Sequence, residues 1–237
     1  MINKIKYILK KPLKLIGEKI PITVKYGPLR GYRILVVSPI KFFKGTYEKE
    51  RTEMFLKIIK EGDIFYDIGA HFGFYSLIAS RIIGDKGKIY AFEPHPYNLK
   101  ILRKHIELNN ITNVVIISAA VSDRPGKAKF AYGTGTGTGH LSEKGDIEVD
   151  TVSIDDLIQK KEILPPSIIK IDVEGAEILV LKGAWNTITL FYPVIFLAAH
   201  SIELLRNADQ MLLNINYKKI NFKCRSNGDI EVLYLPY

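Results

Sequence analysis

The sequence predicts a doubly wound α/β domain built around a seven-stranded, mostly parallel sheet. From residue 63 onward, short apolar runs alternate with amphipathic stretches, which is typical of βαβ units. A turn containing two glycines, residues 67–73, follows the first of these runs directly. Near the C-terminus, residues 227–229 (NGD) lie between the last two strand-like runs, and this turn signal predicts an antiparallel hairpin.

Length and composition limit the possible organisation. The 237 residues suffice for one substantial domain, which we divide into an extension over 1–45 and a Rossmann-like domain over 46–237. Because Cys224 is the single cysteine, a disulfide framework and a cysteine-based metal cluster are excluded. The net charge of +9 favours an anionic partner, a membrane surface or nucleic acid. No apolar run approaches the ~20 residues that span a bilayer, so we expect a cytoplasmic protein.

The first 20 residues combine an apolar stripe with positive charge. Apolar residues recur at steps of three and four, and six lysines accompany one acid, Glu18. One hypothesis is a helix docked on the domain, and Pro12 would divide it. The other is an interfacial helix on the inner membrane surface. The lysines at positions 4, 6, 10 and 11 also interrupt any signal-peptide core.

The remaining elements follow in order along the chain. Turn signals at Gly27–Pro28 and Gly31 predict a short strand pair within 22–38, and a helix is expected at about 48–60. The expected strands of the main sheet are 63–67, 88–92, 114–121, 168–172, 193–199, 217–222 and 230–235. The helices expected between them are 74–83, 96–109, 176–184 and 202–214.

Residues 125–152 interrupt this alternation. Strand-like pieces at 127–132 and 146–152 flank an alternating Gly/Thr run over 133–139. The run is interpreted either as a solvated connector or as a mobile lid over a substrate. After it, Ser153 and Asp156 have the spacing of a capping box, which predicts a short helix.

Two acidic residues at strand ends indicate a nucleoside site. Asp67 ends the first strand of the alternation, and Glu93 follows the next strand, where a carboxylate can accept ribose hydroxyls. A nicotinamide dinucleotide would need closely spaced glycines around its pyrophosphate, but His71 stands where the middle glycine would be. S-adenosylmethionine has no phosphate and carries a sulfonium and an ammonium group. An acid beside a short glycine turn therefore suits S-adenosylmethionine better.

Several segments together resemble one known family. Residues 67–76 (DIGAHFGFYS), 91–94 (AFEP), 119–123 (AAVSD) and 169–177 (IKIDVEGAE) are similar to motifs of the FkbM-type methyltransferases. Residues 45–48 (GTYE) and 151–156 (TVSIDD) also match that pattern, so the resemblance covers about 42–200. It implies a class I methyltransferase-like fold and S-adenosylmethionine as cofactor. It also implies O-methylation of a hydroxyl on a sugar, glycan or small metabolite, and the glycan acceptor can be lipid-linked.

The resemblance also implies a set of site residues. The glycine turn would line the methionine end of the cofactor, Glu93 would bind the ribose, and Ala120 would border the adenine. Asp172 and Glu174 would lie near the sulfonium and the acceptor. The expected cofactor-binding residues are Glu48, Asp67, Gly69, Ala70, His71, Gly73, Glu93, Pro94, Ala120 and Asp172.

The expected catalytic residues are His200, Asp172 and Glu174, and no metal is expected. Val194–Ala199 contains no acid where the family often has one, which draws attention to His200 directly after it. A histidine at a strand's carboxyl end can accept the acceptor's proton, so His200 is the preferred base and Glu174 the next candidate. His71 and His140 also fall where a pocket is expected.

Three alternatives stay open. A nicotinamide-dependent oxidoreductase can use the same sheet, but the middle glycine is missing. A nucleic-acid methyltransferase fits the positive charge, but 172–175 (DVEG) is acidic and lacks the aromatic that grips a flipped base, so we expect no nucleic acid. The third alternative is a degenerate scaffold without activity, which the presence of Asp67, Glu93 and Asp172 together disfavours.

Overall fold

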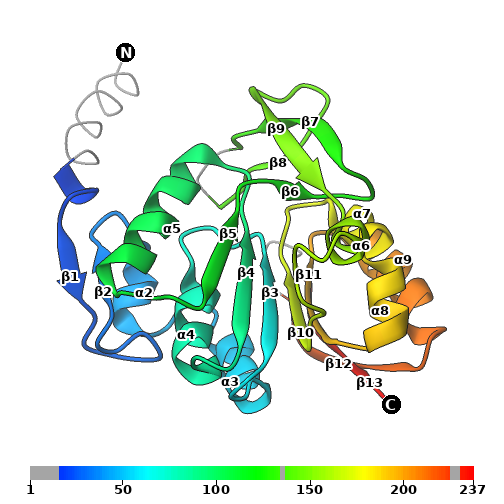
Figure 1. The fold of residues 1–237 in the computed structure, drawn as a ribbon, viewed down its shortest axis with the longest axis horizontal. Helices are drawn as coiled ribbons and strands as arrows, with labels where there is room; N and C mark the ends of the chain where they lie inside the picture. The colour runs from blue at the N-terminus through cyan, green and yellow to red at the C-terminus, as the bar shows by residue number, and fades with distance from the viewer. Residues whose placement is uncertain (1–15, 134–136, 225–229) are drawn as a thin grey trace.

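The computed structural model describes residues 16–133, 137–224 and 230–237, and a seven-stranded sheet forms its centre (Figure 1). The strand order is β12-β13-β11-β10-β3-β4-β5. All neighbours from β11 to β5 pair in parallel, whereas β13 pairs antiparallel with both β11 and β12. The strands are β3 (Ile64–Ile68), β4 (Lys88–Phe92), β5 (Val114–Ile117), β10 (Ile168–Ile171), β11 (Val194–Ala199), β12 (Tyr217–Cys224) and β13 (Ile230–Pro236). This is the class I methyltransferase-like topology that was expected.

Helices cover both faces of this sheet, as a doubly wound fold requires. On one face α2 (Ile40–Lys44), α3 (Lys49–Ile58), α4 (Phe74–Ile83) and α5 (Pro96–Leu108) contribute to one apolar cluster. On the other face α6 (Ile154–Gln159), α7 (Glu177–Gly183), α8 (Trp185–Phe191) and α9 (Ile202–Leu213) contribute to a second cluster. The strand order reverses between β3 and β10, so the crevice at their carboxyl ends is the expected ligand site.

Two predicted elements differ from the structure. The strand expected over 114–121 is divided, because β5 ends at Ile117 and β6 (Ala120–Val121) belongs to another sheet. The helix expected over 176–184 ends as α7 at Gly183, and α8 was not predicted. A Cβ on Gly183 would lie 1.9 Å from the Ser122 carbonyl oxygen, so tight packing against that loop fixes the end of α7.

The interruption at 125–152 forms a second, four-stranded sheet of order β6-β9-β7-β8. Its other strands are β7 (Gly126–Ala131), β8 (His140–Leu141) and β9 (Ile147–Val152), which confirms the two predicted strand pieces. Figure 1 shows this small sheet above the ends of β4 and β5. The predicted capping of α6 is also present, since the Ser153 hydroxyl accepts a hydrogen bond from the Asp156 backbone N–H.

The N-terminal segment packs on the main domain from residue 16 onward. Strands β1 (Pro21–Thr23) and β2 (Arg33–Leu35) form the predicted antiparallel pair. The Leu35 N–H donates to Nε2 of His105 in α5, and the Tyr32 hydroxyl donates to the Leu77 carbonyl in α4. The stripe over residues 1–15 and the turn at 227–229 lie outside the described residues, and so does the centre of the Gly/Thr run. In the part of the chain that is described, no helix is long and apolar enough to cross a bilayer.

Candidate active site

The glycine turn after β3 brings the chain close to the end of β10. Gly69 has φ +78°, and a Cβ there would lie 2.0 Å from the Asp172 carbonyl oxygen, so the close approach requires glycine. Gly73 has a different role, because a Cβ added at this position would lie 2.4 Å from Cδ1 of Leu102. Gly73 therefore allows α4 to pack on α5. Gly69, Ala70 and His71 line cavities at the site, whereas Gly73 is not among the lining residues.

Asp67 is enclosed behind the turn. It is fully buried, and Oδ2 accepts hydrogen bonds from the backbone N–H and the hydroxyl of Ser76. Its Oδ1 lies 3.0 Å from Nζ of Lys170, which also donates to the Gly69 carbonyl over 2.8 Å. Asp67 is opposite Lys170 in the register of β3 and β10, so it is not level with Asp172. In this structure Asp67 positions Lys170 and α4.

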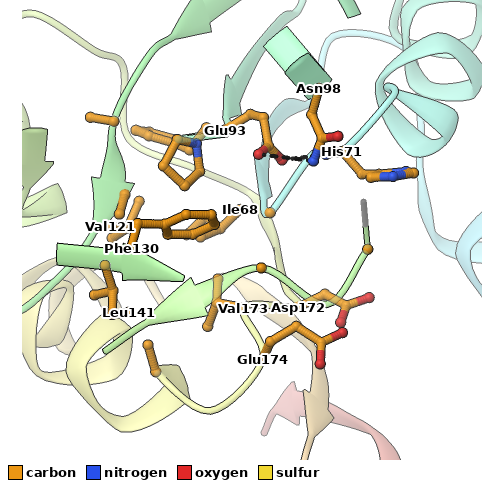
Figure 2. A pocket seen from close by; sticks show the side chains of 18 residues that line it. Ile68, His71, Glu93, Asn98, Val121, Phe130, Leu141, Asp172, Val173 and Glu174 are labelled. Carbon is orange, nitrogen blue, oxygen red and sulfur yellow. Dashed lines mark hydrogen bonds between the residues drawn. The ribbon is translucent and has the colours of Figure 1, made fainter. Parts of the chain in front are cut away.

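Glu93 lies at the end of β4 and is directed into the first cavity (Figure 2). The backbone N–H groups of His71 and His95 donate to its two carboxylate oxygens over 2.7 and 2.9 Å, and Asn98 adds a bond of 3.2 Å. Burial raises the pKa of Glu93 to about 7, against the opposing effect of these donors. Oε2 accepts only one of these bonds and keeps accepting capacity, so a fixed acceptor for a ribose hydroxyl is available where the sequence predicted one.

The first cavity is mainly apolar apart from its two ends. Phe130, from the small sheet, lies across it, and Figure 2 shows Glu93 and Asn98 on one side with Asp172 and Glu174 on the other. The apolar lining suits a flat aromatic ring, and it consists of Ile68, Phe92, Pro94, Ala119, Ala120, Val121, Phe130, Leu141, Val173 and Ala176.

A second cavity adjoins the first and contains charges of both signs. The two cavities share Gly69, His71, Gly137, Asp172 and Glu174. The second cavity adds one cation and one carboxylate beside an aromatic wall, contributed by Lys170, Glu48, Phe42, Tyr47, Phe74 and Tyr75. A zwitterionic ligand end, with an ammonium and a carboxylate, would find a counter-charge for each group here.

Arg51 in α3 connects three acidic residues behind this cavity. Its guanidinium lies 3.0 Å from Glu48, 2.8 Å from Asp172 and 3.1 Å from Glu231, and it is buried. Although burial opposes the charge, Glu48 and Asp172 raise the pKa of Arg51 well above its ordinary value. Burial would raise the pKa of Asp172, but Arg51 and then Lys170 hold it well below its usual range. Arg51 thus keeps Asp172 ionised at the cavity wall.

His200 follows β11 and faces three carboxylates. Its Nδ1 lies 2.7 Å from Glu177, and its Nε2 lies 3.4 Å from Glu174 and 3.6 Å from Asp172. Burial would lower the pKa of His200, but the neighbouring carboxylates of Glu174, Glu177 and Asp172 raise it to about 10. An imidazolium cannot accept a proton, so this environment weighs against the predicted role of His200 as a general base. His71 has the opposite shift, since burial and then Lys170 lower its pKa to about 4.

Sequence reasoning did not identify Lys170, Arg51 or Phe130. Lys170 had a visible signal, because a lysine inside the apolar run 168–171 is buried and needs a partner. Arg51 and Phe130 had none, since they come from elements whose placement over the sheet depends on tertiary packing. His140 forms part of β8 and is not among the residues that line the two cavities.

Comparison with known proteins identifies what this chain resembles. A family model for the methyltransferase FkbM domain matches residues 67–228, more than half of the chain. Hexuronic acid methyltransferase AglP of Haloferax volcanii is 29% identical over 60% of this chain and 58% of AglP. A ribosomal protein L11 methyltransferase of Caldanaerobacter subterraneus is 32% identical over 46% of this chain and 36% of that protein. The chain therefore spans less than two thirds of the length of either relative.

Solved structures agree on the fold. A methyltransferase FkbM from Methylobacillus flagellatus superposes with a TM-score of 0.56 at 17% identity, covering 83% of this chain and 55% of that chain. A SAM-dependent O-methyltransferase from Thermotoga maritima gives a TM-score of 0.52 at 11% identity, with coverages of 81% and 66%. Similarity at these identities shows a shared class I methyltransferase-like architecture.

Proposed function

The chain belongs to the FkbM family of S-adenosylmethionine-dependent methyltransferases, and we propose that it methylates a hydroxyl group of a sugar or glycan. The observation that carries the proposal is the pair of adjoining cavities at the carboxyl ends of β3 and β10. One is apolar with a carboxylate at its end, and the other presents both charges. This division matches the adenosine and amino-acid halves of S-adenosylmethionine.

The proposed cofactor position follows from matching each group to its partner. The adenine lies against Phe130 and Ala120 in the apolar cavity, and the ribose hydroxyls donate to Glu93. The amino-acid end occupies the second cavity, where Lys170 faces its carboxylate and Glu48 faces its ammonium. The sulfonium then lies at the shared wall, beside Gly69 and Asp172. Asp67 contributes indirectly, by holding Lys170.

This placement directs the methyl group toward the residues at the ends of β10 and β11. The acceptor oxygen must lie in line behind the S–CH₃ bond, and positioning provides much of the acceleration of such a displacement. Glu174 and Asp172 can accept hydrogen bonds from the hydroxyls of a sugar. The support for the kind of sugar is the name of AglP, a hexuronic acid methyltransferase. The proposed acceptor is accordingly a uronic acid residue, free or in a lipid-linked glycan.

Methyl-labelled cofactor tests this function directly. Purified protein is incubated with labelled S-adenosylmethionine and either uronic acid oligosaccharides or matched neutral ones, and the products are analysed by mass spectrometry and NMR. We expect an O-methyl ether on the uronic acid series. The Glu93→Ala variant should bind S-adenosylhomocysteine about 10- to 150-fold more weakly, because a charged hydrogen bond of about 1.5–3 kcal/mol is lost. Labelling of nitrogen or carbon, or of nucleic acid instead of sugar, would contradict the proposal.

A further inference from the structure

Three potential metal ligands converge at the carboxyl ends of β10 and β11. One ligand atom from each of Asp172, Glu174 and His200 lies within 4.8 Å of the others. Figure 2 shows the carboxylates of Asp172 and Glu174 side by side at the edge of the first cavity. The group therefore faces the space where the methyl donor and acceptor are proposed to meet.

The spacing of these atoms suits a shared cation better than a direct hydrogen bond. Nε2 of His200 lies 3.4 Å from Glu174 and 3.6 Å from Asp172. Well-formed N–H···O bonds measure about 2.7–3.2 Å. In contrast, two ligands that each lie about 2.0–2.2 Å from one ion, at an angle of roughly 90–110°, are about 3.0–3.5 Å apart.

Glu177 provides a second and independent observation. Its side chain is fully buried, and Oε1 holds Nδ1 of His200 at 2.7 Å. Oε2 has no hydrogen-bond partner among the described residues. A histidine that binds a metal through one ring nitrogen commonly has the other nitrogen held by a carboxylate, which orients the ring. Glu177 orients His200 in this way, with Nε2 directed at Asp172 and Glu174.

The cluster around His200 contains more negative than positive charge. Asp172, Glu174 and Glu177 surround one imidazole, and Arg51 shares its charge between Asp172 and two other acids. A buried carboxylate with an unbonded oxygen is costly unless a positive charge lies near it. A divalent ion between the three ligands would supply that charge.

We propose that Asp172, Glu174 and His200 bind one divalent cation. One imidazole and two carboxylates form a mixed nitrogen and oxygen set, which suits Mn²⁺ or Zn²⁺ better than Ca²⁺. Three protein ligands leave coordination positions open, and the acceptor hydroxyl can occupy one. No metal ligands were expected from the sequence. In the sequence 26 positions separate Glu174 from His200, and the pairing of β10 with β11 brings them together.

The use of this ion in catalysis rests on the proposed function. A hydroxyl bound to a divalent cation loses its proton more easily, and the proton passes to solvent. The resulting alkoxide oxygen forms a bond to the methyl carbon, the carbon–sulfur bond breaks, and its electron pair stays on sulfur. The products are the methyl ether and S-adenosylhomocysteine. No free side-chain base is needed, because His200 is neutral and occupied when its Nε2 binds the ion.

Titration calorimetry on chelator-treated, full-length protein tests the binding without cofactor or acceptor. We expect saturable binding of one Mn²⁺ or Zn²⁺ per chain and much weaker binding of Ca²⁺. Glu174→Gln should weaken binding at least tenfold, and His200→Ala more strongly. Glu203→Gln, an exposed acid in the first turn of α9, is the matched control and should leave binding unchanged.

Two results would overturn the proposal. One is the absence of saturable binding of Mn²⁺ and Zn²⁺ to the unaltered protein, which would leave an ion-paired cluster around a protonated His200. The other is unchanged affinity in Glu174→Gln. Glu174 is 30% exposed and the change to Gln preserves its shape, so this variant stays informative if His200→Ala fails to fold. Binding of S-adenosylhomocysteine, measured on the same samples, reports separately on the proposed methyltransferase function.

Discussion

The carboxyl ends of β3 and β10 lie side by side and carry the same residue type, yet the two aspartates have different surroundings. Asp67 is completely enclosed, with Ser76 and Lys170 bonded to its oxygens. Asp172 lines both cavities and shares Arg51 with two other acids. A strand-end position brings an acid near the crevice, but its neighbours decide whether it faces a ligand.

This contrast separates residues that build the site from residues that contact ligands. Asp67 fixes Lys170, and Lys170 fixes the Gly69 carbonyl in the turn. Asp172, Glu174 and Glu93 present carboxylates to open space. Substitutions in the first group should therefore reduce stability most, and substitutions in the second should reduce ligand affinity.

The largest expected effect is a loss of stability when Asp67, the enclosed aspartate, is replaced. Asp67→Ala leaves the Lys170 ammonium buried without its carboxylate, and removing one partner of such a pair costs about 3–5 kcal/mol of unfolding free energy. Glu174→Ala, at the open end, should change stability by less than about 1 kcal/mol. Urea unfolding followed by circular dichroism measures both. Equal losses in the two variants would remove the distinction between the two strand ends.

Substitution of Lys170 tests whether this residue, which is bonded to the enclosed Asp67, also contacts the cofactor. In an Asp67→Asn, Lys170→Met double variant no unpaired charge is left, and affinity for S-adenosylhomocysteine should fall about 10- to 100-fold because one charged hydrogen bond is lost. Methylthioadenosine lacks the amino-acid end, so its affinity should change less than about threefold. Calorimetry with both ligands shows whether the loss is specific to the amino-acid end of the ligand. A similar loss for both ligands would instead indicate a general distortion of the site.

The pH dependence of cofactor binding should report on Glu93. Because burial raises its pKa to about 7, the carboxylate that accepts ribose hydroxyls is lost as the pH falls through 7. Affinity for S-adenosylhomocysteine should then drop by up to about tenfold per pH unit below 7. His71 stays neutral over this range, since its pKa is lowered to about 4. The Glu93→Gln variant is the control and should show a flat profile between about pH 6 and 7.5.

The last expected effect concerns the N-terminal segment and involves neither strand end. Residues 1–20 carry six lysines, and Ile16 and Ile20 are 56% and 45% exposed in the described part. We propose that this segment contacts anionic membranes, with on the order of 1 kcal/mol per lysine that salt screens. The protein should cosediment with phosphatidylserine vesicles at low salt and be released at high salt. A truncation that begins at Pro21 should stay folded and lose this binding, whereas equal binding to neutral vesicles would contradict the idea.

Much of the fold could be predicted because it depends on local patterns. The apolar runs at 64–68 and 168–171 are continuous, as strands buried on both faces require, and α4 has the predicted bounds. The break of β5 at Ile117 and the division of α7 from α8 could not be predicted. Both depend on contacts with segments distant in sequence, such as Gly183 against Ser122.

The sequence by itself determined the sheet, the glycine turn and the acidic residue types at the strand ends, because periodicity and turn chemistry are properties of neighbouring residues. Only the tertiary structure decided which acid is enclosed and which is open. It placed Lys170 opposite Asp67, Arg51 beside Asp172 and Glu177 behind His200. These pairings join residues from 23 to 121 positions apart, and the charge state of a buried group depends on such neighbours in space.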